Sequence, residues 1–282
     1  MLTPQGAPTP PRSRAPAGAV DCHFHIFGPF DRFPLSPGRR YDPPLALVED
    51  YRAVATRLGL GRQIVVQASV MGTDNRCTLD AVAQLGRAQA RAIAVIDDGF
   101  SPAALRELAA GGVIGARFNA VSGNGTPLDQ LVPIARRIAP LGWHLQIYAH
   151  GDIWPDLAPK LAVLPVPVVI DHMGGIPAVW GKDHPAGQAL NRLLDTGRAW
   201  IKLCGYRVSA GPPYGDLQVA ARRFIRHAPE RMLWGTDWPH TSLEGRALPD
   251  DGMLLDLLAD WVETPADWQR ILVDNPVRLY GF

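Results

Sequence analysis

The sequence has no marked excess of charge of either sign. Its 282 residues include 28 Lys and Arg against 27 Asp and Glu, a formal net charge of +1. These charges are scattered along the chain, so there is no basic stripe that would suit nucleic acid or an anionic membrane surface. A small-molecule partner is therefore expected, with neither nucleic acid nor membrane involved.

Cysteine and long apolar runs are also scarce. The three cysteines, Cys22, Cys77 and Cys204, are odd in number and form no C-x-x-C pair. A disulfide framework and a zinc ribbon are therefore not indicated, and a reducing cytoplasm fits this usage. No run approaches the roughly 20 apolar residues of a membrane span. Residues 1–19 are rich in Pro, Ala and Gly and lack the apolar core of a secretion signal, so we expect a disordered tail there.

After this tail the chain alternates short apolar runs with amphipathic helical patterns. That alternation is typical of parallel strands joined by crossover helices. No G-x-G-x-x-G follows the first run, so the sequence favours a closed (β/α)8 TIM barrel over an open doubly wound sheet. We expect one large (β/α)8 domain over residues 20–282, with strands at Val20 to Ile26, Gln63 to Ala68, Ala92 to Ile96, Val113 to Phe118, His144 to Tyr148, Val166 to Asp171, Trp200 to Cys204 and Arg231 to Gly235.

The segments between these strands supply helices and long loops. Leu47 to Leu58 has an apolar stripe at helical spacing, and the pattern recurs at Leu128 to Leu141 and Leu217 to His227. Two loops rich in Pro and Gly, Gly28 to Pro44 and Gly174 to Pro185, are expected to cover a substrate.

Polar residues gather where the expected strands end, which in a barrel is the face that carries the chemistry. The first strand contains Asp21, His23 and His25 at two-residue spacing, which predicts that they share one face while Cys22 and Phe24 point to the other. At the other strand ends, Arg117 ends the fourth strand, Tyr148 closes the fifth and is followed by His150, Asp171 and His172 close the sixth, and Arg207 follows the seventh.

The eighth strand delivers one carboxylate at its end. The apolar run Met232-Leu233-Trp234 is followed by Gly235-Thr236-Asp237-Trp238-Pro239-His240, and the Pro239 ring cannot continue a ladder. Asp237 is therefore placed at the C-terminal end of a strand, either as a catalytic base or as a residue that caps a turn. His240 is a candidate supporting partner three residues later.

An H-x-H at the first strand, a histidine at the sixth and the W-G-T-D-W-P-H stretch at the eighth resemble the amidohydrolase superfamily. Within it, the chain resembles the 2-pyrone-4,6-dicarboxylate lactonases over nearly its whole length after the tail. The supporting stretches are Val20 to Pro29, Val65 to Ser69, Arg117 to Asn119, Val169 to Gly174 and Val273 to Tyr280.

The resemblance implies a cytoplasmic enzyme of aromatic compound catabolism that hydrolyses a lactone ring without a metal. Asp237 would take a proton from water, while His23, His25 and His172 would polarise the lactone carbonyl. Substrate carboxylates would be held by Arg117 and Arg207, helped by Tyr41, Ser69 and Tyr148.

Two departures from the lactonase pattern put the substrate in question. The stretch Ala120 to Gly125 lacks the second basic residue that those enzymes place there, and Gln67 stands where a histidine is expected. A lactone with one carboxylate, a sulfonated muconolactone or a sugar acid lactone would fit the altered site as well.

The same residues also allow other interpretations, namely a metal site or a binding protein without catalytic activity. His23, His25 and Asp237, with His150 or His172, could hold a single Zn²⁺. Arg117 would repel a second cation, so a binuclear centre is not expected.

A zinc-dependent decarboxylase of the same superfamily would use the same residues and release carbon dioxide. A non-catalytic binder of an organic acid would gain nothing from Asp237. The sequence is compatible with a monomer or a small homo-oligomer.

Overall fold

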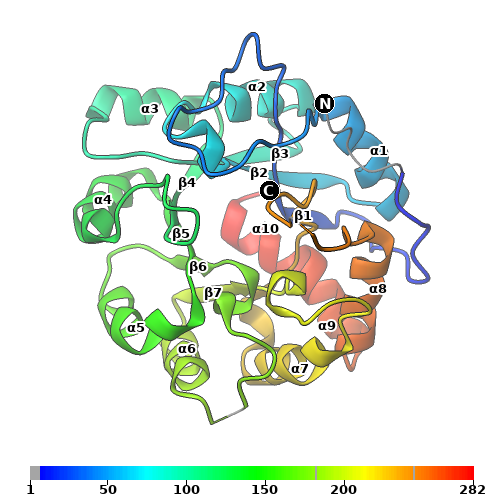
Figure 1. Ribbon diagram of the computed structural model, residues 1–282. Coiled ribbons are helices and arrows are strands. Elements are labelled where there is room, and N and C mark those ends of the chain that lie inside the picture. The colour runs from blue at the N-terminus through cyan, green and yellow to red at the C-terminus, as the bar shows by residue number, and fades with distance from the viewer. Residues whose placement is uncertain (1–6, 182, 244) are drawn as a thin grey trace.

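The computed structural model describes residues 7–181, 183–243 and 245–282, which form a ring of parallel strands surrounded by helices (Figure 1). The strands are β1 (Val20–Phe24), β2 (Arg62–Val66), β3 (Ala90–Ala94), β4 (Val113–Asn119), β5 (His144–Tyr148), β6 (Val168–Ile170), β7 (Ala199–Lys202) and β8 (Met232–Leu233). The helices are α1 (Val48–Leu58), α2 (Arg76–Leu85), α3 (Pro102–Ala110), α4 (Leu131–Ile138), α5 (Trp154–Ala162), α6 (Pro185–Asp195), α7 (Gln218–His227), α8 (Asp251–Trp261), α9 (Pro265–Gln269) and α10 (Asn275–Tyr280).

The sheet runs in sequence order from β1 to β8, and every paired strand is parallel. Backbone hydrogen bonds close the ring between β1 and the chain after β8. Cys22 N donates to Trp234 O at 3.0 Å, Asp237 N to His23 O at 2.7 Å and His25 N to Trp238 O at 2.8 Å. The expected TIM barrel is therefore confirmed, and its closure draws Asp237 against the H-x-H strand.

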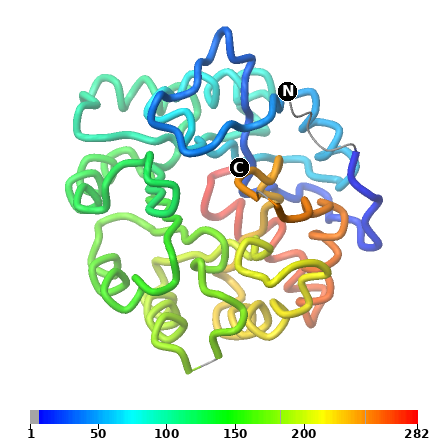
Figure 2. Tube along the Cα trace, in the orientation of Figure 1, coloured from blue at the N-terminus to red at the C-terminus, as the bar shows by residue number. Residues whose placement is uncertain are grey.

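The apolar core has two parts. A small cluster inside the barrel contains Val20, Cys22, Ile64 and Leu233 and is extended by Tyr280 of α10, which lies in the middle of the ring in Figure 2. A larger cluster fills the space between the strands and the surrounding helices. Because both faces of each strand are buried, the strands appear in the sequence as nearly continuous apolar runs.

All eight strands lie within two residues of the expected bounds, and several end earlier than expected. β8 stops at Leu233 instead of Gly235, and β1 stops at Phe24 instead of Ile26. These ends bend out of the ladder into turns that present the polar residues. The expected helices also form, although 3-10 turns at Leu128–Gln130 and Ala139–Leu141 flank α4.

The segment that was expected to be a disordered tail differs from that expectation over residues 7–19. Its Thr9 hydroxyl donates to Asp250 at 2.6 Å, and the Arg12 guanidinium contacts Asp256 at 3.2 Å and Asp260 at 2.9 Å. These acidic residues belong to α8 and its N-cap, and they tie a Pro-rich stretch that has no regular structure of its own. Residues 1–6 of the tail lie outside the described residues. Within the described part of the chain, no helix is long and apolar enough to cross a membrane.

Candidate active site

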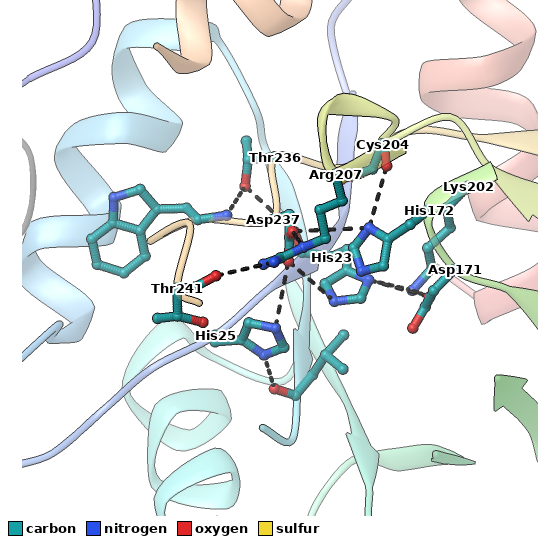
Figure 3. A network of polar contacts seen from close by, with 12 residues as sticks. His23, His25, Asp171, His172, Lys202, Cys204, Arg207, Thr236, Asp237 and Thr241 are labelled. Atoms are coloured by element: carbon teal, nitrogen blue, oxygen red, sulfur yellow. Dashed lines mark hydrogen bonds and ion pairs between the residues drawn. The ribbon is translucent and has the colours of Figure 1, made fainter. Parts of the chain in front are cut away.

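The four expected catalytic residues meet at the C-terminal face of the barrel (Figure 3). His23 Nε2 and His25 Nε2 each lie 3.6 Å from Asp237 Oδ1, and His172 Nδ1 lies 3.9 Å from Asp237 Oδ2. The rings of His25 and His172 each lie 5.0 Å from that of His23, centroid to centroid. All four residues are buried, and the barrel brings them together from β1, β6 and β8.

The expected two-residue alternation along β1 is wrong for Asp21 and for the pair Cys22 and Phe24. A register shift, a β-bulge, falls between Asp21 and Phe24 in the pairing with β2. Cys22 consequently packs inside the barrel, whereas Phe24 stacks on Tyr51 of α1 at 3.5 Å between ring centroids. A bulge adds a residue to one strand and reverses the side that follows it, so alternation does not persist through it.

Asp21 is not one of the residues around Asp237 but stabilises the backbone on which they lie. Its carboxylate accepts hydrogen bonds from the backbone N–H groups of His23 and Thr236, at 3.0 and 3.1 Å, and from the hydroxyls of Tyr51 and Thr236, at 3.0 and 2.7 Å. Burial raises the pKa of Asp21 to about 6, and these hydrogen bonds oppose the rise. Asp21 thus fixes the chain on both sides of the barrel closure.

Backbone strain marks two of the four residues. Asp237 has φ of 62° and His172 has φ of 50°, both in the left-handed region. Few residues other than glycine adopt this region, and those that do cluster at functional sites. In both cases the turn directs a buried side chain toward the barrel axis.

The two oxygens of Asp237 have different surroundings. Oδ2 accepts hydrogen bonds from Arg207 Nε at 2.5 Å and from the Tyr206 hydroxyl at 2.6 Å. Oδ1 has no hydrogen-bond partner among the described residues and faces His23 and His25. Burial alone would raise the pKa of Asp237, but the charge of Arg207 and the neighbouring histidines hold that pKa well below its usual range. Asp237 is therefore a carboxylate with one free oxygen.

Backbone carbonyls fix the ring tautomers of His25 and His172. His25 Nδ1 lies 2.7 Å from Val66 O, and His172 Nδ1 lies 3.2 Å from Cys204 O. A carbonyl only accepts, so Nδ1 carries the proton and Nε2 of each neutral ring carries a lone pair. Burial lowers the pKa of both histidines, to about 4 for His172, so the rings are neutral near pH 7. The expected role of these two rings as donors to a carbonyl would need a second ring proton.

His23 has a different environment that the sequence did not indicate. Its Nδ1 lies 3.2 Å from Lys202 Nζ, and Lys202 also donates to Gln146 Oε1 at 2.8 Å and lies 3.3 Å from Asp171 Oδ1. All four side chains are fully buried. Lys202 follows Trp200 on β7 at two-residue spacing and so points into the barrel, which is the signal that could have identified it.

A cavity of about 130 Å³ opens beside Asp237. All five residues expected to bind substrate line it, together with three of the four expected catalytic residues: Arg117, Arg207, Tyr148, Tyr41, Ser69, His25, His172 and Asp237. His23 is not among the described residues that line this cavity, and its side chain is fully buried. Direct contact between His23 and a substrate stays a prediction.

Both arginines already have partners inside the protein. Arg117 Nη1 donates to Gln67 O at 3.1 Å, and its Nε lies 3.4 Å from Asp171 Oδ2. Arg207 Nη1 donates to Thr241 O at 3.0 Å. These contacts hold each guanidinium, and both arginines line the cavity.

The two departures from the lactonase pattern have structural roles. The Gln67 amide donates to Gly72 O and Asp74 O, at 3.1 and 2.9 Å, and accepts from the Thr78 hydroxyl, so it supports the loop after β2. After β4, Asn119 Oδ1 accepts from the backbone N–H groups of Val121 and Ser122, at 3.1 and 2.9 Å. Val121 and Ser122 line the cavity where a basic residue was expected.

His240 supports the site from outside the cavity. Its Nε2 lies 3.0 Å from Asp251 Oδ1, and its ring packs edge-on against Tyr206, 5.2 Å between centroids. Tyr206 in turn donates to Asp237, so His240 is connected to Asp237 through this tyrosine, and its supporting role stays a prediction.

The cluster of His23, His25 and Asp237 could hold a metal ion, since one ligand atom from each lies within 4.8 Å of the others. His25 Nε2 carries a free lone pair and Asp237 Oδ1 is unpartnered, which suits a cation. The third ligand atom, His23 Nε2, suits a cation only if its ring proton is on Nδ1, and that nitrogen faces the ammonium of Lys202.

Comparison with known proteins agrees with this geometry. The family described as Amidohydrolase matches residues 20–282. A 2-pyrone-4,6-dicarboxylate hydrolase of Comamonas testosteroni is 40% identical over 97% of this chain and 93% of its own length. A 4-sulfomuconolactone hydrolase of Hydrogenophaga intermedia is 36% identical over 99% of this chain and 94% of its own.

A solved structure extends the likeness to three dimensions. The crystal structure of a probable 2-pyrone-4,6-dicarboxylic acid hydrolase from Acinetobacter baumannii, with citric acid bound, has a TM-score of 0.83 and 27% identity, covering 94% of this chain and 100% of the other. The resemblance expected from the sequence motifs is confirmed by these matches.

Proposed function

The chain belongs to the amidohydrolase family, and on that premise we propose that it is a hydrolase that opens the ring of a small carboxylated lactone. The observation that carries the proposal is Asp237, which lines a cavity together with two arginines and whose Oδ1 has no hydrogen-bond partner among the described residues. Free carboxylate oxygen and guanidinium groups together supply a base for water and anchors for substrate carboxylates.

In this mechanism Asp237 is the general base. A water molecule attacks the lactone carbonyl carbon, and its proton passes to Asp237 Oδ1 as the new C–O bond forms. His25 Nε2, 3.6 Å from that oxygen, accepts the second hydrogen bond of the water and orients it. Collapse of the tetrahedral intermediate breaks the ring C–O bond, and the proton on Asp237 passes to the departing ring oxygen. Water and lactone are thereby converted to the open acid without an added co-reactant.

The carbonyl oxygen and the substrate carboxylate take the donors at the cavity wall. Arg117, Tyr148, Tyr41 and Ser69 offer N–H and O–H groups there, while Arg207 holds Asp237 and the nearby loop. This assignment moves the stabilisation of the developing oxyanion from His25 and His172 to neighbouring donors, because the neutral rings present lone pairs. His172 supports the cavity wall through its edge-on contact with Tyr148, 4.6 Å between centroids.

The substrate is proposed as 2-pyrone-4,6-dicarboxylate or a related lactone. The relatives include hydrolases of this pyrone and of sulfomuconolactone, and the Acinetobacter structure holds citric acid, a polycarboxylate. The uncharged wall at Val121 and Ser122 favours a lactone that needs fewer cationic anchors.

A substrate panel of pyrone dicarboxylate, sulfomuconolactone, muconolactone and sugar acid lactones, followed by proton release, tests the proposal. Absence of hydrolysis across the panel would overturn it.

We further propose that hydrolysis proceeds without a metal. If a single Zn²⁺ is bound, His23, His25 and Asp237 would hold it, and it would supply Lewis acidity to the water or the carbonyl. Elemental analysis of the purified protein and an assay after chelation separate the two cases. Stoichiometric zinc with activity lost on stripping would contradict the metal-free proposal. A cytoplasmic location and a monomer or small homo-oligomer stay predictions.

A further inference from the structure

We infer that Lys202 is a positioning residue that fixes the ring tautomer of His23 and thereby directs an N–H group at the free oxygen of Asp237. The inference deepens the proposed lactone hydrolysis and rests on it for its catalytic consequence. The tautomer itself is a property of the resting protein and can be measured without any lactone.

Three groups surround the Lys202 ammonium in the barrel. Gln146 Oε1 lies at 2.8 Å, His23 Nδ1 at 3.2 Å and Asp171 Oδ1 at 3.3 Å. An ammonium has three N–H donors and no acceptor, so Lys202 can only donate to Gln146 Oε1 and His23 Nδ1, while Asp171 Oδ1 lies at ion-pair distance. His23 Nδ1 must therefore carry a lone pair, and the ring proton is on Nε2.

The orientation of the His23 ring indicates whether Lys202 or Asp171 is the hydrogen-bond partner of its Nδ1. Nδ1 lies at nearly the same distance from both, 3.2 Å from Lys202 Nζ and 3.3 Å from Asp171 Oδ1. Only the contact with Lys202 has hydrogen-bond geometry, and Asp171 Oδ1 has no hydrogen-bond partner among the described residues. The ring thus faces the ammonium, and the contact of Nδ1 with Asp171 Oδ1 is an ion-pair distance without hydrogen-bond geometry.

The remaining buried groups hold Lys202 in place. The Gln146 amide nitrogen donates to Asp171 Oδ2 at 3.0 Å, so Gln146 accepts from Lys202 with its oxygen. Asp171 supplies the countercharge at ion-pair distance, and Lys202, Gln146 and Asp171 are all fully buried. These polar partners fix the position of the Lys202 side chain inside the barrel.

The result is an asymmetry among the three histidines. His25 and His172 donate through Nδ1 to backbone carbonyls and present lone pairs at Nε2. His23 is reversed, and its Nε2–H points toward Asp237 Oδ1, 3.6 Å away. If His23 had the other tautomer, its lone pair would face the carboxylate oxygen, and the two acceptors would repel each other or attract a cation. Lys202 therefore keeps Asp237 Oδ1 oriented for a water molecule.

The direct test is the tautomer of His23 in the wild-type protein. Long-range ¹H–¹⁵N spectra of protein labelled with ¹⁵N-histidine distinguish a protonated from an unprotonated ring nitrogen, and the His23→Gln spectrum assigns the signals. We expect His23 to be protonated at Nε2, and His25 and His172 at Nδ1. A wild-type His23 protonated at Nδ1 would overturn the inference, and the tautomer is read from the wild-type protein without any lactone.

Two substitutions then separate the hydrogen bond of Lys202 from its charge. Lys202→Met removes the donor, and we expect the His23 proton to move to Nδ1 and kcat to fall about a hundredfold, the scale for a lost catalytic hydrogen bond, while KM changes little. Lys202→Gln removes the same charge but keeps an N–H donor, so the wild-type tautomer and most of kcat should be retained. Equal losses in the two variants, or an unchanged tautomer in Lys202→Met, would contradict the inference.

Exposed Lys160 of α5 provides the matched control, because Lys160→Met removes a lysine charge outside the site. The two proposals can fail independently. Lack of turnover on every lactone with the expected tautomer present would reject the proposed function alone. Full turnover with His23 protonated at Nδ1 would reject the role of Lys202 alone.

Discussion

At the scale of single residues, the site depends on the unequal surroundings of the two oxygens of Asp237. Oδ2 is held by Arg207 and Tyr206, and Oδ1 is free. A carboxylate with a strongly lowered pKa is a weak base in water. Here two hydrogen bonds to Oδ2 hold Asp237 at the cavity, so proximity to a bound water compensates for the low pKa.

Replacement of this base gives the first prediction. Asp237→Asn keeps the size of the side chain and removes its ability to accept a proton. We expect turnover to fall at least about a hundredfold, the usual scale for a general base, while ligand binding stays largely intact. Steady-state kinetics and calorimetric binding of a product acid measure the two quantities. Exposed Asp195→Asn is the control, and near wild-type turnover in Asp237→Asn would refute the assigned role.

Arg207 gives a prediction about pH. Its charge is the largest favourable influence that lowers the pKa of Asp237. In Arg207→Gln that pKa should rise, so the acid limb of the kcat/KM profile should move to higher pH, because the carboxylate then gains its proton at a higher pH. The matched control is exposed Arg226→Gln, which removes an arginine paired with Glu263 at the surface. A profile whose acid limb stays in place would argue that Asp237 is not the group observed.

At the scale of elements, the junction between β1 and the chain after β8 positions the site. Gly235 packs so closely against β1 that a Cβ there would lie 2.6 Å from His23 N and 2.8 Å from His23 Cβ. A side chain at this position cannot be accommodated unless the two segments separate. Asp21 holds the same junction by its hydrogen bonds to Thr236.

We therefore expect Gly235→Ala to damage stability and activity together. Overpacking of this kind costs about 1–3 kcal/mol, and the displaced segment carries Asp237 away from His23 and His25. Urea unfolding and kcat measured on the same preparation test this. Gly215→Ala is the control, because a Cβ at exposed Gly215 meets no atom within 4 Å. A Gly235→Ala protein with unchanged unfolding free energy and kcat would contradict the importance of the close packing of Gly235 against β1.

The alternation of side chains along the strands, with every second residue on one face, predicted some of the site residues. It could have predicted further site residues on β5 and β7. On β5, His144, Gln146 and Tyr148 alternate, and on β7 Trp200 and Lys202 do the same. Reading these inward faces would have placed Gln146 and Lys202 in the barrel with His23. The same reasoning failed on β1, where a bulge shifts the register and turns Asp21 toward α1.

At the scale of the whole molecule, the barrel buries several histidines in neutral form. Burial lowers the pKa of His144 to about 3 and that of His172 to about 4, against an ordinary value of 6.5. Between these values and 6.5 the unfolded chain binds more protons than the folded one, so stability must fall as pH decreases through this window. Asp21 acts in the opposite sense, because its pKa is raised from 3.8 to about 6 and its contribution is lost as pH rises through 6.

The pH dependence of unfolding tests this balance. With a folded pKa of about 3, His144 should make the protein about 2 kcal/mol less stable at pH 5 than at pH 8. His144 lies at the start of β5, away from the cavity. In His144→Gln the difference in unfolding free energy between the two pH values should shrink by about that amount, and His227→Gln at the surface is the control. An equal pH difference in wild type and His144→Gln would contradict the neutral buried ring.

The sequence by itself determined the barrel, its eight strands and the gathering of His23, His25, His172 and Asp237 at one face. It could do so because strand burial, crossover helices and C-terminal strand ends follow from local pattern. The tertiary structure alone decided which partner each polar atom has. Lys202 is 179 residues from His23 in the chain, and Asp171 and Gln146 come from two further strands. Hydrogen-bond partners and ring tautomers depend on such long-range contacts, so residue order along one strand cannot specify them.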